Sequence, residues 1–359
     1  MKYFSPHINK IIVVFFINTT YFVFAQKPVT EFKGFGHLEF TFNQVEKPTA
    51  FFSIGEHDFF VTSQLKKRIS FLGEYVFRFN GKSPSNYLPS IERSLLKFNY
   101  KGNHNVIIGK IHTPVNYWND VYHHGRLFFP TIERPLAFSY IIPLHSLGVQ
   151  MQGQNLGKNN FGYDLVVANG ISSTDIFHDD THMSLTAAMH IKPTEFTRLG
   201  ISYYYDFLSE NNPGAHSGHS SSYAHYTGKP YVGSLAFQLA SVSIAHFSNK
   251  FEILSESSYN LTDTDSLGIA NNFSSFLYAG YIIKEKHVPY LLIDYINIAK
   301  NDLFTHELGI YKFGLGYKHE FNHLLNIKAQ LEYQRFFHGH VEHAQHDVFG
   351  VKVQFAYGF

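Results

Sequence analysis

The chain of 359 residues contains no cysteine. Disulfides therefore cannot stabilise it, and a lipid anchor attached through a cysteine is excluded. Beyond the first 25 residues, no stretch approaches the ~18 uninterrupted apolar residues that a membrane-spanning helix needs. A mean hydropathy of −0.15 also argues against a helical membrane protein. Stability must come from backbone hydrogen bonds and side-chain packing.

Charge is scarce and nearly balanced. Charged residues make up 16% of the chain, the formal net charge is +1, and only seven residues are arginine. This balance gives no indication of a nucleic-acid partner. No nucleophile elbow, P-loop or zinc-hydrolase pattern occurs. We therefore expect no enzyme activity and no cofactor, although the sequence alone leaves open a Ser–His pair at the rim of an outer-membrane hydrolase.

Phenylalanine and tyrosine, in contrast, are abundant. The chain has 37 Phe and 24 Tyr but one Trp, so aromatics reach 17%. A soluble protein has little use for so many rings. A transmembrane β-barrel needs them on its lipid-facing surface and in the girdles at both interfaces.

The first residues are typical of an export signal. Lys2 and Lys10 provide a basic start, an apolar stretch follows, and a short Val-Phe-Ala sequence ends at Ala25. Polar residues interrupt the apolar stretch, which makes it a poor spanning helix. We predict a signal peptide over 1–25 and a mature chain, 26–359, that forms one barrel domain.

Side chains alternate strictly between apolar and polar or small along much of the mature chain, as in Val351–Phe359. The segments that show this dyad have roughly the 9–12 residues that a tilted membrane strand requires. They predict an all-β fold, a transmembrane antiparallel up-and-down barrel of about sixteen strands. Strands are expected near residues 34–43, 52–64, 69–80, 91–100, 105–112, 144–153, 160–169, 182–191, 196–207, 231–247, 251–260, 273–283, 288–298, 308–319, 325–336 and 347–359.

Two details of this pattern bear on the topology. The stretch 231–247 changes register, so it holds either one strand or a hidden hairpin. Short connections alternate with longer ones, which places the short turns on the side of both termini, the periplasm in an outer-membrane barrel. A soluble β-sandwich would rarely need so many strands, and a multidomain adhesin would show linkers or repeats, which we do not find.

Several short motifs resemble porins of Gram-negative outer membranes, in particular those grouped with phosphate-selective porin O/P and related porin-like barrels. The motifs are Ile107–Val115, followed by Asn116 where glycine is usual, His123–Gly125, Thr131–Pro135, Gly148–Gln150 and Val166–Gly170. The resemblance implies a passive channel for small hydrophilic solutes or ions, trimeric or monomeric, embedded in a lipid bilayer with lipopolysaccharide. Phosphate selectivity does not transfer, because no ladder of Lys or Arg is evident.

A connection of about 30 residues, 113–143, is the most informative segment outside the strands. A loop this long inside a compact fold is usually functional. By analogy with porins it would fold into the lumen as a constriction, where Asp120, Arg126, Glu133 and Arg134 would set a transverse field. The alternative is a surface loop that its Arg–Glu pairs merely hold together.

The remaining polar residues on the alternating face carry both signs of charge, so strong ion selectivity is not expected. The residues predicted to face the lumen are Glu74, Arg78, Lys97, Lys110, Asp164, His190, Asp206, Glu252, Glu256, Asp294, Lys328, Glu332 and Lys352.

Histidine is unusually frequent, with 23 residues, many of them in the predicted outer loops. His338, His340, His343 and His346 form one tract, and imidazole is a ligand for Zn²⁺ and other transition metals. One hypothesis is metal capture at the pore mouth, in a surface metal-binding or receptor barrel with a plugged lumen. The other is that these loops simply need polar, uncharged residues. Calorimetry with Zn²⁺ distinguishes them.

The last strand predicts how the chain is assembled. Phe359, Tyr357 and Phe355 share one face, which resembles the signal that the barrel-assembly machinery reads. We expect deletion of Phe359 to lower the fraction of chain inserted into the outer membrane, measured by fractionation and heat-modifiable gel migration. Insertion of the truncated chain at the level of the full chain would contradict this.

Overall fold

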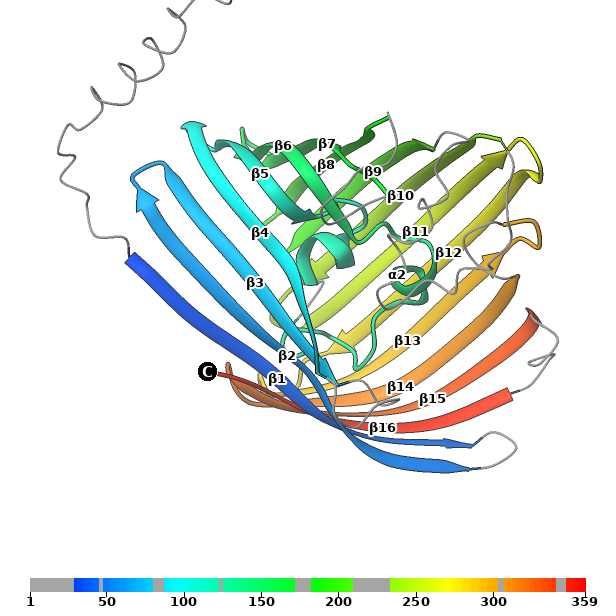
Figure 1. The fold of residues 1–359 in the computed structure, drawn as a ribbon. Coiled ribbons are helices and arrows are strands. Elements are labelled where there is room, and N and C mark those ends of the chain that lie inside the picture. Colours follow the sequence, from blue (N-terminus) through cyan, green and yellow to red (C-terminus); the bar gives the residue numbers. More distant parts are fainter. Residues whose placement is uncertain are drawn as a thin grey trace, which may run out of the picture.

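The computed structural model shows a closed barrel of sixteen antiparallel strands (Figure 1). Each strand pairs with its neighbours in sequence, and β1 closes the barrel against β16. The structure describes residues 29–44, 48–79, 87–122, 125–171, 182–208, 233–302, 307–339 and 347–359. The predicted signal peptide, 1–25, lies outside this part of the chain.

The strands are β1 (Val29–Gln44), β2 (Thr49–Lys66), β3 (Ile69–Phe79), β4 (Tyr87–Lys101), β5 (His104–His112), β6 (His145–Leu156), β7 (Phe161–Ala168), β8 (Ser184–Thr194), β9 (Thr197–Leu208), β10 (Leu235–Phe247), β11 (Phe251–Thr264), β12 (Gly268–Tyr281), β13 (His287–Ile298), β14 (Leu308–Asn322), β15 (Leu325–Gly339) and β16 (Asp347–Gly358).

Every segment predicted to be a strand is one, which confirms the predicted barrel. The largest differences are at strand ends: β1 begins at Val29 rather than near 34, because its first residues also pair with β2. The ambiguous stretch 231–247 holds a single strand, β10, which pairs continuously with β11. Within the described residues, no helix is long and apolar enough to cross a membrane.

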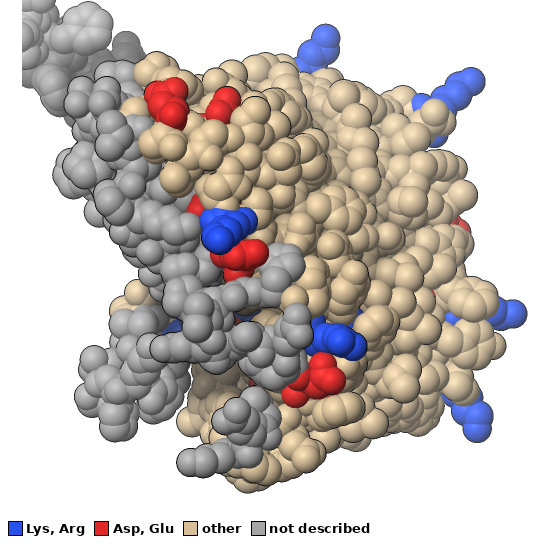
Figure 2. All heavy atoms as spheres, turned by 90° about the vertical axis from the view of Figure 1, so that its right-hand side faces the viewer, with Lys and Arg blue, Asp and Glu red and all other residues tan. Residues whose placement is uncertain are grey.

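The alternation separates two faces of the sheet. On β6, Val149 and Met151 are exposed on the outside, whereas Gln150 between them is buried in the interior. Figure 2 shows a broad outer surface almost free of charge, with most charged side chains near its edges. Exposure of a continuous apolar band of this size to water would be unfavourable, so we assign this face to the lipid.

The interior face collects the polar side chains. Of the residues predicted to face the lumen, Arg78, Lys97, Lys110 and Glu252 are partly buried. The following are buried: Glu74, Asp164, His190, Asp206, Glu256, Asp294, Lys328, Glu332 and Lys352.

Strand β5 departs from the simple pattern. Ile107 and Ile111 are buried and cluster with Val166 and Ala168 of β7, whereas Ile108 is 56% exposed. Ile107 and Ile111 therefore face inward. Lys110 alternates with them along the strand and so belongs to the opposite, outward face. The prediction that Lys110 faces the lumen is not supported by this register. Part of the lumen wall is apolar, which sequence alternation alone could not reveal.

The seam between β1 and β16 is closed by the last residue. Phe359 and Gly34 exchange backbone N–H···O bonds of 2.9 Å in both directions. The Phe359 ring lies only 2.3 Å from where a Cβ on Gly34 would stand, so a larger residue at position 34 would displace the ring. Phe355 and Phe359 are partly exposed on the outer face. Their role as an assembly signal stays a prediction.

The lipid-facing assignment predicts the cost of a charge at mid-strand. Leu315, 66% exposed, sits near the middle of β14 and pairs with Leu331 of β15. We expect Leu315→Arg to lower the free energy of unfolding by about 2–4 kcal/mol, because a charge at the bilayer midplane is poorly solvated.

The matched control is Tyr281→Arg, at the end of β12 and also exposed. Near the interface the expected cost is about 0–1 kcal/mol. Equilibrium unfolding in lipid vesicles measures both. Equal costs for the two variants would argue against the assignment.

Candidate permeation site

The connection between β5 and β6 folds into the barrel. It contains a single π-helical turn, η1 (Trp118–Tyr122), and a short helix, α2 (Leu136–Tyr140). Trp118, Phe129 and Phe138 are buried against the inner faces of β10 to β13. The segment is therefore an inserted loop rather than a surface loop, and its role as a constriction stays a prediction. We call residues 113–144 the inserted loop.

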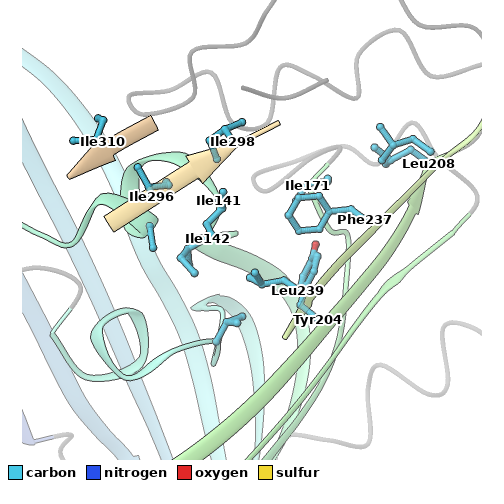
Figure 3. Packing of buried hydrophobic residues seen from close by; sticks show 13 residues of the cluster. Ile141, Ile142, Ile171, Tyr204, Leu208, Phe237, Leu239, Ile296, Ile298 and Ile310 are labelled. Atoms are coloured by element: carbon cyan, nitrogen blue, oxygen red, sulfur yellow. The ribbon is translucent and has the colours of Figure 1, made fainter. Parts of the chain in front are cut away.

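Apolar packing holds the α2 side of the inserted loop. Val115, Ala137, Ile141 and Ile142 lie in one buried cluster with side chains of β9, β10, β13 and β14. Figure 3 shows Ile141 and Ile142 of the loop facing Ile296 on one side and Leu239 and Tyr204 on the other. The lumen is thus filled by packed side chains on this side. Burial of this kind contributes about 25 cal/mol per Å² of apolar surface.

Carboxylates on the wall accept backbone N–H groups of the inserted loop. Glu256 Oε1 accepts from Trp118 N at 2.7 Å, and Asp294 Oδ2 accepts from Leu136 N at 2.7 Å. On the opposite wall, Asp58 Oδ2 accepts from Gly125 N at 3.0 Å. All three carboxylates are buried. Since an unpaired N–H in the interior would be costly, these bonds determine where the loop lies.

Glu133 is the loop's contact with the β14–β16 wall. Its two carboxylate oxygens pair with Lys312 and Lys352. Both lysines also lie near Glu332, at 3.5 and 2.9 Å, so the four side chains form a ring of alternating charge. Burial alone would raise the pKa of Glu133, but the two ammonium groups outweigh it and hold the pKa far below its ordinary value.

Arg126 and Arg134 contact the neighbouring part of the wall, beyond β1, through one residue, Glu56 of β2. Arg134 Nη2 lies 2.8 Å from Glu56 Oε2, and Arg126 Nε lies 3.8 Å from the same atom. Arg78 of β3 donates to the other oxygen at 3.0 Å. Both loop arginines also stack over the ring of Phe129, at 5.1 and 5.4 Å. Three guanidinium groups thus surround one carboxylate.

Asp120 makes a third contact, separate from the other two. Its carboxylate accepts from Arg198 of β9 at 2.7 Å. The four residues predicted to form the constriction therefore all lie in the barrel interior, but the structure does not gather them at one point. Glu133, Asp120 and the two arginines each pair with a different part of the wall. Sequence alternation found several wall partners, such as Glu256 and Lys352, but it could not tell which loop residue each would meet.

The inserted loop covers the wall unevenly. On β12, every interior residue from Ala270 to Gly280 in alternation is buried. On the opposite side, Lys97 of β4 and Gln152 of β6 face the interior and remain partly exposed.

The predicted metal-binding tract lies mostly outside the described residues. His338 belongs to β15, while His340, His343 and His346 fall in the part that the structure does not describe. Among the described residues, no group of three or more His, Cys, Asp or Glu side chains is placed to hold a metal ion. The capture hypothesis for this tract stays untested.

Comparison with known proteins bears on the fold. No protein-family model matches the chain, and no curated protein matches it in sequence. Solved structures do match it. The anion-selective porin of Comamonas acidovorans has a TM-score of 0.65 at 10% identity and covers 93% of this chain and 100% of its own. The chain has a porin-type fold.

Two further structures agree. The outer-membrane channel DcaP of Acinetobacter baumannii gives a TM-score of 0.62 at 10% identity, over 92% of this chain and 97% of that one. OmpT of Vibrio cholerae, described as a trimer form, gives 0.61 at 11% identity, over 92% and 99%. At such low identity the likeness establishes the fold and leaves the function to be argued from the site.

The ring around Glu133 predicts how acid and mutation act on the inserted loop. Trp118, the single tryptophan, is buried in that loop and reports its packing. Glu133→Gln leaves Lys312 and Lys352 with Glu332 as their remaining partner in the ring. We expect red-shifted Trp118 emission and stronger quenching by acrylamide in the variant, with no such change for the exposed control Glu195→Gln.

The pH dependence follows from the lowered pKa. A carboxylate whose pKa falls below its ordinary 4.5 on folding stabilises the fold fully above that value. The stabilisation is lost only as the pH falls through the lowered pKa. Wild-type Trp118 emission should therefore show an acid transition well below pH 4.5 that is missing from Glu133→Gln. Identical acid titrations of the two proteins would contradict the role of this ring.

Proposed function

We propose that this protein is an outer-membrane porin of a Gram-negative bacterium, a passive diffusion channel for small hydrophilic solutes or ions that catalyses no reaction. The observation that carries the proposal is the inserted loop, which narrows a polar lumen and is tied to the wall by ion pairs on opposite sides. Solved porins share the fold. The short motifs noted in the sequence favour kinship with phosphate-selective porin O/P, without its selectivity.

The route proposed for solutes runs between the inserted loop and the part of the wall formed by β4 and β6. Lys97 and Arg93 of β4 line this route, and Arg93 is partly neutralised by Glu74. Fixed charges of both signs along a narrow path discriminate weakly between ions. Size and polarity would therefore decide which solutes pass, with a mild preference for anions set by Lys97.

A second candidate is a barrel whose lumen is closed and whose outer loops act as a receptor or bind metal. The observation in its favour is that the inserted loop reaches opposite walls, through Arg198 of β9 on one side and Lys352 of β16 on the other. Single-channel recording separates the two candidates: conductance steps comparable to those of general porins favour the channel, and silence favours the closed barrel.

The remaining context follows from the same proposal. Residues 1–25 would direct export, the barrel-assembly machinery would insert the mature chain, and lipopolysaccharide would surround its outer leaflet. The apolar outer face leaves room for a homotrimer, the form described for one structure of the same fold.

Ion selectivity tests the part played by the loop arginines. We expect Arg126→Glu/Arg134→Glu to move the reversal potential toward cation preference in a salt gradient across a planar bilayer, because two positive charges in the lumen become negative. The control, Lys67→Glu, changes an exposed residue in the short β2–β3 turn and should leave the potential unchanged. An unchanged potential in the double variant would show that the arginines do not face the permeation route.

A further inference from the structure

Two histidines face each other on the outer surface of the barrel, outside the histidine tract 338–346. His287 begins β13 and His319 lies near the end of β14, and the two are partners in the strand register. Their rings are 4.7 Å apart and inclined by 38°. The two Nδ1 atoms are separated by 3.3 Å. Each imidazole thus directs its Nδ1 atom at the Nδ1 atom of the other.

A tyrosine hydroxyl lies beside the two imidazoles. Tyr317, two residues before His319 on the same strand face, places its hydroxyl against His287 Nδ1. This diagonal contact is the one expected between neighbouring antiparallel strands. Tyr317 is 42% exposed on the outside. Two imidazole nitrogens and one phenol oxygen thus meet at one point of the surface.

The separation of the nitrogens fits a shared ligand. Two nitrogens bound to a tetrahedral zinc at ~2.0–2.1 Å lie about 3.3–3.4 Å apart. The observed 3.3 Å needs little rearrangement to admit the ion. Imidazole and phenolate oxygen are ligands that borderline transition-metal dications accept, whereas Ca²⁺ and Mg²⁺ prefer all-oxygen sites.

The backbone around the pair is fixed before any ligand arrives. His287 and Ile283 exchange hydrogen bonds of 3.1 and 2.8 Å across the β12–β13 turn. Glu320 N donates to Lys286 O at 2.9 Å, which ties β14 to the same turn. The ring of Phe321 packs edge-on against His319 at 4.6 Å. Both imidazoles therefore start from defined positions, which lowers the entropy cost of binding.

We propose that His287, His319 and Tyr317 form a binding site for a transition-metal dication, with Zn²⁺ as the representative ion, at the short-turn rim of the barrel. Water from the interface completes the coordination. The ion would link β13 to β14 where the strands leave the apolar band. This site is independent of the lumen and of the proposed channel activity. The competing interpretation is a direct hydrogen bond between the imidazoles with no ion bound.

The test uses the full chain in detergent, with His338, His340, His343 and His346 replaced by Asn so that the loop tract does not bind the probe. Zn²⁺ titration by calorimetry gives the stoichiometry, and Co²⁺ absorption gives the geometry, since tetrahedral Co²⁺ absorbs far more strongly than the hydrated ion. We expect one saturable site per chain and a tetrahedral Co²⁺ spectrum.

Two variants identify the ligands in this background. His287→Asn/His319→Asn should abolish both the saturable Zn²⁺ site and the Co²⁺ spectrum. Tyr317→Phe should keep the site but weaken Zn²⁺ binding about tenfold, as loss of a supporting group does at metal sites.

His104→Asn is the matched control. His104 Nδ1 also lies beside a tyrosine hydroxyl, that of Tyr163 at 3.0 Å, but among the described residues no second imidazole packs against it. This variant should bind Zn²⁺ like the background chain. Absence of a saturable site from the background chain, or an equal loss in His104→Asn, would overturn the proposal. Circular dichroism and heat-modifiable migration establish that each variant is folded.

Discussion

The structure depends on one constraint, that every backbone N–H and C=O within a lipid bilayer must find a partner in the protein. An open sheet would leave two rows of unpaired groups in hydrocarbon, at a cost of several kcal/mol each. Closure of β1 against β16 removes both edges. The close fit of Phe359 over Gly34 shows how tightly this seam is made. With the backbone satisfied, the side chains are free to divide into an apolar outside and a polar inside.

The polar inside then has its own requirement, because charges taken out of water need partners. The inserted loop meets it by offering arginines to Glu56, a carboxylate to Lys312 and Lys352, and backbone amides to Glu256 and Asp294. The same contacts that neutralise the wall also position the loop. The position of the loop and the stability of the interior are therefore consequences of a single set of interactions, which is why a change at one pair is expected to alter both.

Burial along the wall adds a consequence for transport. The loop packs apolar side chains against β12 and β13, whereas Lys97 of β4 and Gln152 of β6 remain partly exposed. A channel with one packed side and one open side places its solute against a limited set of residues. Most charges in the loop are paired. They would therefore act on a solute mainly through the residual electric field that remains because paired charges do not cancel completely.

The sequence by itself determined the strands, their number and the face that each presents. This is possible because the alternation has a period of two and the lipid penalises any polar residue on the wrong side. It also singled out 113–143 as the informative connection, but left open whether that segment enters the barrel or lies on its surface. It misassigned Lys110 to the lumen, since the inward face of β5 carries the apolar Ile107 and Ile111, which cluster with Val166 and Ala168 of β7.

Only the tertiary structure decided which charges meet. Glu133 and Lys352 are 219 residues apart, and Arg134 and Glu56 are 78 apart. The pairing of His287 with His319 likewise depends on the register between two strands. Local patterns fix the face on which a side chain lies, whereas its partner depends on the stagger of the strands and the path of the loop, which arise only when the barrel closes.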